Sequence, residues 1–154
     1  MRRPPDVGDP APDFTLPSTH GRVSLLERVR EGAVLLVFFP KDYTLVCTRQ
    51  LCNYRDHLSA FEALDVQIVA INDDELATHR AFSDKYDFPF PLCSDPKRSV
   101  CEAYGALGDL WKLRRLLVLV GEDGRIWWRR AELRAFYRKA AALERVIAEL
   151  RAER

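Results

Sequence analysis

Two short apolar runs with a helical pattern between them constrain the fold of this chain most strongly. Residues 33–39 (AVLLVFF) and 66–72 (VQIVAIN) are rich in β-branched and aromatic side chains, and Gly32 and Pro40 bound the first run. Runs of this length and composition predict buried strands. Strand, helix and strand in this order predict a parallel pair joined by a right-handed crossover. Apolar residues at helical spacing predict the intervening helix over about residues 47–63: Leu51, Tyr54, Leu58 and Phe61.

The neighbouring elements follow from turn residues, caps and prolines. In chain order, the sequence predicts an extended N-terminal segment (7–16) with a turn (18–21), a short helix (25–30), a helix capped by Asp73 or Asp74 (75–86), an irregular segment (88–96) and a short helix that Gly105 ends (97–104).

The last third of the chain predicts a hairpin and a terminal helix. Residues 116–120 and 125–129 flank Asp123-Gly124, a dipeptide typical of tight hairpin turns. A chain of 154 residues is long enough to bury a substantial core, so we expect one α/β domain over residues 1–154. Apolar residues on one face predict an amphipathic helix over about residues 135–150: Phe136, Ala140, Leu143, Ile147 and Leu150.

The charge balance and the N-terminal sequence argue against several functions. With 24 basic and 23 acidic residues the formal net charge is +1, so no overall field would recruit nucleic acid or an anionic membrane. The first residues lack the apolar core of a signal peptide, and no apolar stretch is long enough to span a bilayer. We therefore expect a cytoplasmic protein whose four cysteines are catalytic, redox-active or buried thiols, rather than a disulfide framework.

Cys47 occupies a position that favours a reactive thiol. It lies at or near the start of the predicted helix, just beyond the carboxyl end of the first predicted strand. Unpaired N–H groups at a helix start stabilise an anion, and the thiolate is the reactive form of cysteine. An isolated cysteine is more often a small buried residue, so the neighbouring residues decide between the two interpretations.

These neighbouring residues resemble a known active site. Pro40, Thr44 and Cys47 form the pattern Pro-x-x-x-Thr-x-x-Cys, which is similar to the active-site motif of peroxiredoxins, peroxidases that use a cysteine thiol. Cys52, five positions after Cys47, and the pair Arg55-Asp56 resemble the bacterioferritin comigratory protein or PrxQ branch of that family. Two further stretches resemble peroxiredoxins: G-x-x-A-P-D-F-x-L at residues 8–16 and P-F-P-L-x-S-D-P at residues 89–96.

The resemblance implies a thioredoxin-like α/β fold in which helices flank a central mixed sheet. It also implies a peroxidase that reduces hydrogen peroxide and organic hydroperoxides, uses no metal, haem or flavin, and is recycled by thioredoxin or a similar dithiol reductant. We expect a monomer or a weak homodimer. The alternative is a thioredoxin-fold binding or redox-sensing module that the same cysteine pair switches, and repeated turnover would distinguish the enzyme from the module.

The same resemblance gives roles to the three motif residues. Cys47 would attack a peroxide oxygen and become a sulfenic acid. Thr44 would hydrogen-bond the peroxide beside the thiolate, although a Thr that precedes a helix is more often a cap. Pro40 has no N–H and a fixed φ, so it would shape and dry the pocket.

Arg115 matches the second anchor of the family, an Arg six residues before the turn position that Gly121 occupies here. A guanidinium can stabilise the thiolate and the charge that develops as the O–O bond breaks. Leu116 stands where the family usually has Thr or Ser. Arg114 would take the role if the register shifted by one residue, but alternation along the strand points neighbouring side chains to opposite faces, and we favour Arg115.

Cys52 would be the resolving cysteine, which condenses with the Cys47 sulfenic acid to form a disulfide. Positions five apart on an intact helix are too distant and wrongly oriented for this bond, so the first turns must unwind. The alternative is that Cys52 is a core residue and an external thiol resolves Cys47.

Gln50 and Arg55 match polar positions of the motif and would order the helix or the arginine network, unless they are surface residues.

Cys93 and Cys101 are eight positions apart and belong to no Cys-x-x-Cys pair. Together with the three histidines they lack the short paired spacings of a structural zinc site, so we expect no metal site and ordinary burial of both thiols. The histidines are His20, His57 and His79.

Overall fold

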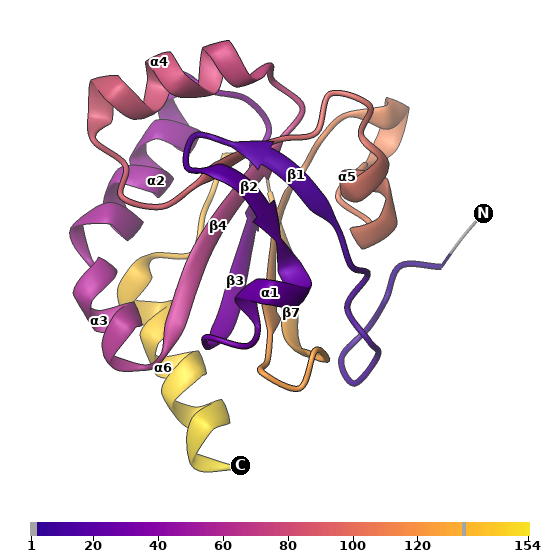
Figure 1. The fold of residues 1–154 in the computed structure, drawn as a ribbon, viewed down its shortest axis with the longest axis vertical. Coiled ribbons are helices and arrows are strands. Elements are labelled where there is room, and N and C mark those ends of the chain that lie inside the picture. Colours follow the sequence, from indigo (N-terminus) through magenta and orange to yellow (C-terminus); the bar gives the residue numbers. More distant parts are fainter. Residues whose placement is uncertain (1–2, 134) are drawn as a thin grey trace.

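The structure is a computed structural model of the chain and describes residues 3–133 and 135–154. A single sheet with the strand order β2-β1-β5-β4-β3-β6-β7 runs through its centre (Figure 1). The strands are β1 (Thr15–Ser18), β2 (Gly21–Ser24), β3 (Ala33–Phe38), β4 (Val66–Asn72), β5 (Leu92–Ser94), β6 (Arg115–Val120) and β7 (Ile126–Glu132).

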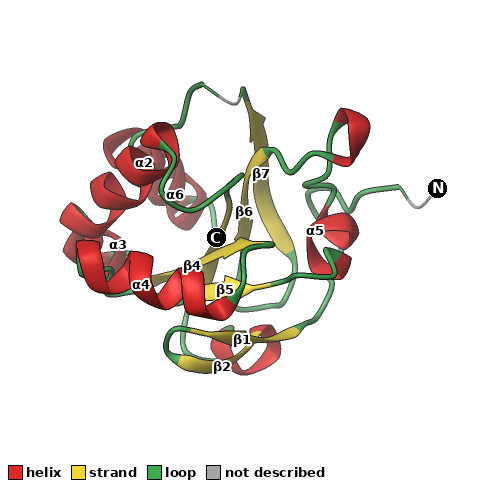
Figure 2. Cartoon of the chain, turned by 90° about the horizontal axis from the view of Figure 1, so that it is seen from above, coloured by secondary structure: helices red, strands yellow, loops and turns green. Residues whose placement is uncertain are grey.

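Helices cover both faces of this sheet, as Figure 2 shows from above. Four helices cover one face: α2 (Leu45–Asp56), α3 (Leu58–Ala63), α4 (Leu76–Tyr86) and α6 (Ala140–Ala152). The other face carries α1 (Leu25–Arg28) and α5 (Ser99–Tyr104), and a short 3-10 turn, η1 (Asp109–Trp111), precedes β6. The chain thus has a separate apolar core on each side of the sheet.

The central strand β3 supplies side chains to both cores. Leu35 and Val37 face the core under α2, whereas Leu36 and Phe38 face the opposite core, because successive residues of a strand point to opposite faces. β3 runs parallel to β4 and antiparallel to β6, which makes the sheet mixed. The carboxyl end of β3 therefore lies beside the start of β6, and α2 begins just beyond these two strand ends.

The predicted parallel pair, the hairpin and the thioredoxin-like arrangement are confirmed, and four details are corrected. The segment 88–96 is not wholly irregular, because β5 lies within it and pairs with β4. The helix predicted over 47–63 is interrupted at His57, whose ring nitrogen lies 2.9 Å from the carbonyl oxygen of Asn53. That oxygen is the acceptor that a continuous helix would offer to the N–H of residue 57.

The other corrections concern helix starts. α6 begins at Ala140 rather than at residue 135, so Phe136 is not on its buried face and is 64% exposed. At α4 the N-cap is Glu75, and neither preceding aspartate caps the helix.

None of the helices in the described part of the chain has the length and apolarity needed to cross a bilayer.

Candidate active site

Cys47 is the third residue of α2 and lies beyond the carboxyl end of the central strand β3. It is 1% exposed and packs in the core beneath that helix. Its Sγ accepts a hydrogen bond from Nη2 of Arg115 at 3.4 Å. The thiol therefore faces the first turn of a helix and a guanidinium, both of which stabilise negative charge on sulfur.

Arg115 reaches Cys47 because it is the first residue of β6, opposite the end of β3. Its side chain is also 1% exposed, and Nη1 donates to Oε1 of Gln50. Arg114, by contrast, donates from Nε to the carbonyl oxygen of Gly105 at 3.2 Å. The alternation along the strand thus points Arg115 towards the thiol and Arg114 away from it.

A chain of hydrogen bonds continues from Gln50 along α2. Gln50 is fully buried and donates from Nε2 to the Tyr54 hydroxyl at 3.2 Å, and that hydroxyl donates to the carbonyl oxygen of Arg138 at 2.6 Å. Burial raises the pKa of Tyr54, so the hydroxyl keeps its proton. The sequence identified Tyr54 only as a core residue, because its partner lies 84 positions away in the chain.

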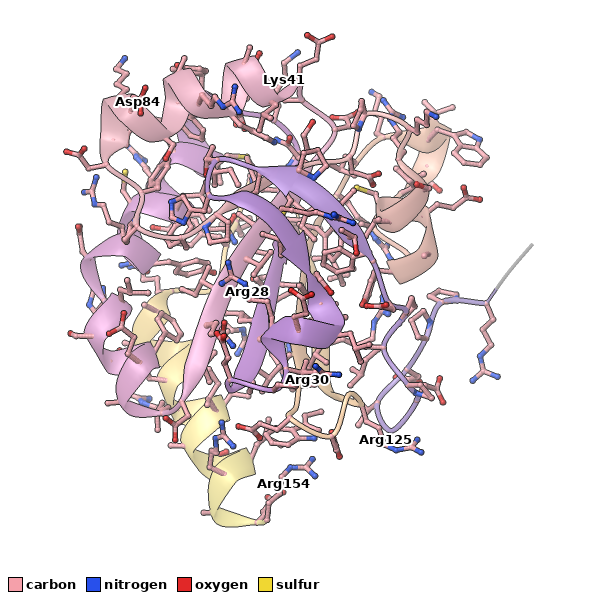
Figure 3. All side chains as sticks on the ribbon, in the orientation of Figure 1. Arg28, Arg30, Lys41, Asp84, Arg125 and Arg154 are labelled. Atoms are coloured by element: carbon pink, nitrogen blue, oxygen red, sulfur yellow. The ribbon has the colours of Figure 1, made fainter. Side chains whose placement is uncertain are left out.

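Pro40 and Thr44 flank the loop between β3 and α2. Thr44 occupies the N-cap position, but its side chain makes no capping bond; Oγ1 donates instead to the carbonyl oxygen of Lys41 at 3.0 Å. Thr44 is exposed and Pro40 is half-buried. Figure 3 shows Lys41 at the upper edge of the molecule, at the opposite end from Arg154.

Cys52 lies five residues further along α2, a little over one turn, and is half-buried. Burial raises the pKa of its thiol, and the nearby Arg55 partly opposes this effect. Five residues of intact helix separate Cys52 from Cys47 by about 7.5 Å along the axis, more than a disulfide spans. The structure therefore holds the two thiols on one helix but does not place them in bonding geometry.

Cys93 and Cys101 lie in the core on the opposite side of the sheet, and the prediction of ordinary burial is confirmed. Burial raises the pKa of Cys93 to about 12 and that of Cys101 still further. Both are inert neutral thiols at neutral pH. Across residues 3–133 and 135–154, no three His, Cys, Asp or Glu side chains form a group that could hold a metal ion.

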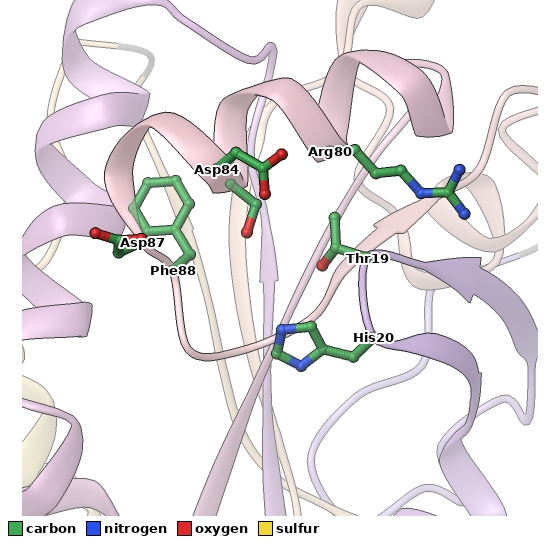
Figure 4. Close-up of a pocket in the computed structure, with 7 residues that line it drawn as sticks. Thr19, His20, Arg80, Asp84, Asp87 and Phe88 are labelled. Carbon is green, nitrogen blue, oxygen red and sulfur yellow. The ribbon is translucent and has the colours of Figure 1, made fainter.

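A pocket of about 430 Å³ lies between the β1–β2 turn and the outer side of α4 (Figure 4). It is lined by polar and charged residues, among them His20, Arg80 and Asp84, and none of the site residues above lines it. The chemistry of Cys47 is therefore separate from this pocket.

A thioredoxin-like sheet with a buried thiol at a helix start, next to a buried arginine, defines a class of thiol-dependent redox proteins. The AhpC/TSA family model matches residues 7–129. The peroxiredoxin Bcp of Bacillus subtilis is 30% identical over 142 residues, which cover 84% of this chain and 88% of that protein. The chloroplastic peroxiredoxin Q of Arabidopsis thaliana is 38% identical over 104 residues, which cover 68% of this chain and 48% of that one.

Solved structures agree with these sequence comparisons. Peroxidoxin BcpB from Mycobacterium tuberculosis is 28% identical with a TM-score of 0.84, covering 97% of this chain and 99% of that chain. A reduced 2-Cys peroxiredoxin from Plasmodium vivax is 25% identical with a TM-score of 0.89, covering 96% and 97%. The chain belongs to the AhpC/TSA family, and within it to the Bcp/PrxQ branch of the peroxiredoxins, which are peroxidases that use a hydroperoxide and a thiol reductant.

Proposed function

We propose that Cys47 is the nucleophile of this peroxidase and that Cys52 resolves the oxidised enzyme through an intramolecular disulfide. The observation that supports the nucleophile best is the contact of 3.4 Å between Cys47 Sγ and Arg115 Nη2, with both side chains 1% exposed. A charge-assisted bond in a water-poor site is stronger than one in bulk water. It favours the thiolate and the negative charge that develops in the transition state.

In the first step the Cys47 thiolate attacks the terminal oxygen of the hydroperoxide. The S–O bond forms as the O–O bond breaks, the sulfur is oxidised by two electrons, and the other oxygen leaves with the electron pair and takes up a proton as water or an alcohol. In our proposal, Arg115 stabilises both oxygens of this transition state. Thr44 contacts the peroxide through its hydroxyl, and Pro40 limits the access of water.

In the second step the Cys52 thiol attacks the Cys47 sulfenic acid, which forms the disulfide and releases water. The helical separation requires the first turns of α2 to unwind for this step. A dithiol reductant then restores both thiols by two thiol–disulfide exchanges.

The reductant in this proposal is thioredoxin or a similar dithiol protein, since the exchange needs two thiols on one partner. We further propose a single-domain protein that acts in the cytoplasm as a monomer or a weak homodimer. These assignments rest on the sequence and on the Bcp and PrxQ names of the relatives.

The test is peroxide consumption with thioredoxin, thioredoxin reductase and NADPH. Cys47→Ser should abolish activity, with a loss of at least roughly a thousandfold, as expected for removal of a nucleophile. Cys52→Ser should stall after one turnover, whereas Cys93→Ser, a matched control in the opposite core, should behave as wild type.

Full thioredoxin-dependent turnover by Cys52→Ser would show that Cys52 is not the resolving cysteine. Activity in Cys47→Ser would refute the proposal. Absence of turnover in the wild type, combined with formation of the disulfide, would favour the redox-sensing module instead.

A further inference from the structure

The loop that carries Pro40 and Thr44 is held by a buried acidic residue that the proposed chemistry does not use. Asp42 lies in the middle of this loop and is only 4% exposed. A carboxylate is costly to bury unless its oxygens are hydrogen-bonded. The partners of Asp42 therefore show what holds the loop in place.

These partners come from the end of β4, from the segment that follows it and from α4. His79, which is fully buried in α4, places Nδ1 2.6 Å from Oδ2 of Asp42. Asn72 at the end of β4 donates to Oδ1 at 3.0 Å, and Oδ2 of Asp74 accepts from the backbone N–H of Asp42 at 2.8 Å. The other ring nitrogen of His79, Nε2, lies 3.0 Å from the carbonyl oxygen of Cys93 in β5.

Both ring nitrogens of His79 thus face oxygen. A carbonyl oxygen can only accept, so Nε2 carries a proton and donates to Cys93. The second proton lies between Nδ1 and Oδ2 of Asp42, on the ring or on the carboxyl. Burial raises the pKa of Asp42, while the hydrogen bond from His79 acts in the opposite direction. The hydrogen bond between His79 and Asp42 persists for either location of the proton, so it holds the loop against α4 in both cases.

Tyr43 provides a second contact between the same loop and the same helix. Its φ is +65°, a conformation that costs energy for a bulky residue and persists only where the surroundings impose it. Its ring packs on Phe82 with centroids 4.8 Å apart. Phe82 follows His79 by three residues, so both project from one face of α4. Arg80 and Asp84 instead line the pocket next to the β1–β2 turn (Figure 4).

We propose that the buried Asp42–His79 pair is a positioning element for peroxide reduction, which fixes the loop of residues 40–44 so that Pro40 and Thr44 enclose the peroxide at Cys47. This inference rests on the proposed function. Among the described residues, the hydrogen bonds of Asp42 and His79 join the pair to each other and to Asn72, Asp74 and Cys93, so the pair acts through the loop. Loss of the Asp42–His79 hydrogen bond should slow the reaction of Cys47 with peroxide, because peroxide has to be oriented. It should not slow the reaction with a reagent that needs only an accessible thiolate.

The experiment compares two reactions of the same thiol. Stopped-flow fluorescence measures oxidation of Cys47 by hydrogen peroxide, and iodoacetamide measures alkylation of Cys47 at the same pH. His79→Phe fills the volume of the ring but removes both of its hydrogen bonds, and it should lower the peroxide rate constant by about 10- to 100-fold, the range expected for misplacement near 1 Å. Alkylation should stay within about twofold, since it needs no oriented partner.

Two Asp42 variants separate geometry from charge. In Asp42→Asn the amide can accept from Asn72 and donate to Nδ1 of His79, so the loop remains tied and the peroxide rate should stay within about threefold of wild type. Asp42→Ala removes both bonds and should match His79→Phe. If Asn and Ala variants lose the same activity, the charge of Asp42 is what matters, and the positioning role is refuted.

Two substitutions of the exposed residue Tyr43 keep the test informative if the Asp42 and His79 variants fold poorly. Tyr43→Ala removes the ring contact with Phe82 and should lower the peroxide rate severalfold without changing alkylation, whereas Tyr43→Phe keeps the ring and should match wild type. Wild-type peroxide rates in His79→Phe or Tyr43→Ala, or an equal loss of both reactions, would overturn the inference. Cys47→Ser serves as the separate control, since activity in that variant refutes the proposed function itself.

Discussion

The two halves of α2 are connected to the rest of the molecule in different ways. In the first half, residues 45–52, the hydrogen bonds of Cys47 and Gln50 to other elements converge on one side chain, that of Arg115. The N-cap side chain makes no capping bond, the first turn has no acidic residue, and Leu45 is 64% exposed. These features leave the start of the helix less stabilised than a well-capped one.

The second half, residues 53–56, makes three side-chain hydrogen bonds to the backbone of two other segments, residues 138–140 and the end of α4. Oδ1 of Asn53 accepts from the N–H of Ala140 at 2.8 Å, the Tyr54 hydroxyl donates to Arg138, and Nη1 of Arg55 donates to the carbonyl oxygen of Tyr86 at 2.6 Å. Both halves bury apolar side chains, so the difference lies in these connections. Elements with fewer connections open at lower free energy, so we expect the first half to be the part that unwinds to form the proposed disulfide.

The largest expected effect comes from removing the residue that connects the first half. Arg115→Met should lower the rate of Cys47 oxidation by hydrogen peroxide about a hundredfold, the loss typical of one donor to a developing negative charge. Arg114→Met, a matched control whose side chain points away from the thiol, should react like wild type. Equal losses in the two variants would show that general positive charge, rather than the contact, matters.

The pH dependence of disulfide closure tests the position of Cys52 at the boundary between the halves. Burial raises the pKa of this thiol, so its thiolate is scarce at neutral pH and increases as the pH rises. Closure after a pulse of peroxide should therefore accelerate by up to about tenfold per pH unit from pH 6 to pH 8. A plateau below pH 7 would contradict a raised pKa.

Helix propensity in the first half gives a smaller effect. Arg49 is exposed in the middle of this half, and Arg49→Gly and Arg49→Ala remove the same charge. Gly disfavours helix by about 1 kcal/mol relative to Ala, so closure of the disulfide should be about fivefold faster in the Gly variant. Equal closure rates would mean that unwinding of this half does not limit the step.

The smallest effect concerns the anchored half. Asn53→Ala removes the acceptor for Ala140 and should lower the free energy of unfolding by about 1 kcal/mol, measured by urea denaturation, with little change in the rate of disulfide closure. Asp56→Ala, at an exposed ion pair with Arg55, should cost less than about 0.5 kcal/mol. A large acceleration of closure in Asn53→Ala would show that unwinding extends past residue 53.

The sequence predicted the parts of this arrangement that depend on local pattern. The runs that form β3 and β4, the hairpin of β6 and β7, and the place of Cys47 at a helix start all follow from periodicity and turn residues. Strand alternation favoured Arg115 over Arg114, and the structure places the Arg115 guanidinium against Cys47.

The remaining features depend on contacts between distant segments, which periodicity does not encode. β5 has three residues and follows two prolines, too short a run to show strand alternation. His79 and Asp42 are 37 positions apart, and each looks like an ordinary polar residue in its own segment. The start of α6 lies at Ala140 because Asn53 accepts its N–H, and no local cap indicates this boundary.

Amide hydrogen exchange in the reduced and the disulfide forms tests the central claim most directly. The account predicts that forming the Cys47–Cys52 disulfide removes protection from the amides of residues 48–56, which donate to the carbonyl oxygens of residues 44–52 in the intact helix. The amides of His57 and Ala140, which donate to Tyr54 and Asn53, should stay within about threefold of the reduced protein. Loss of protection at His57 and Ala140 as well, or unchanged protection across the whole of α2 in a protein that carries the disulfide, would contradict the division of this helix into a mobile and an anchored half.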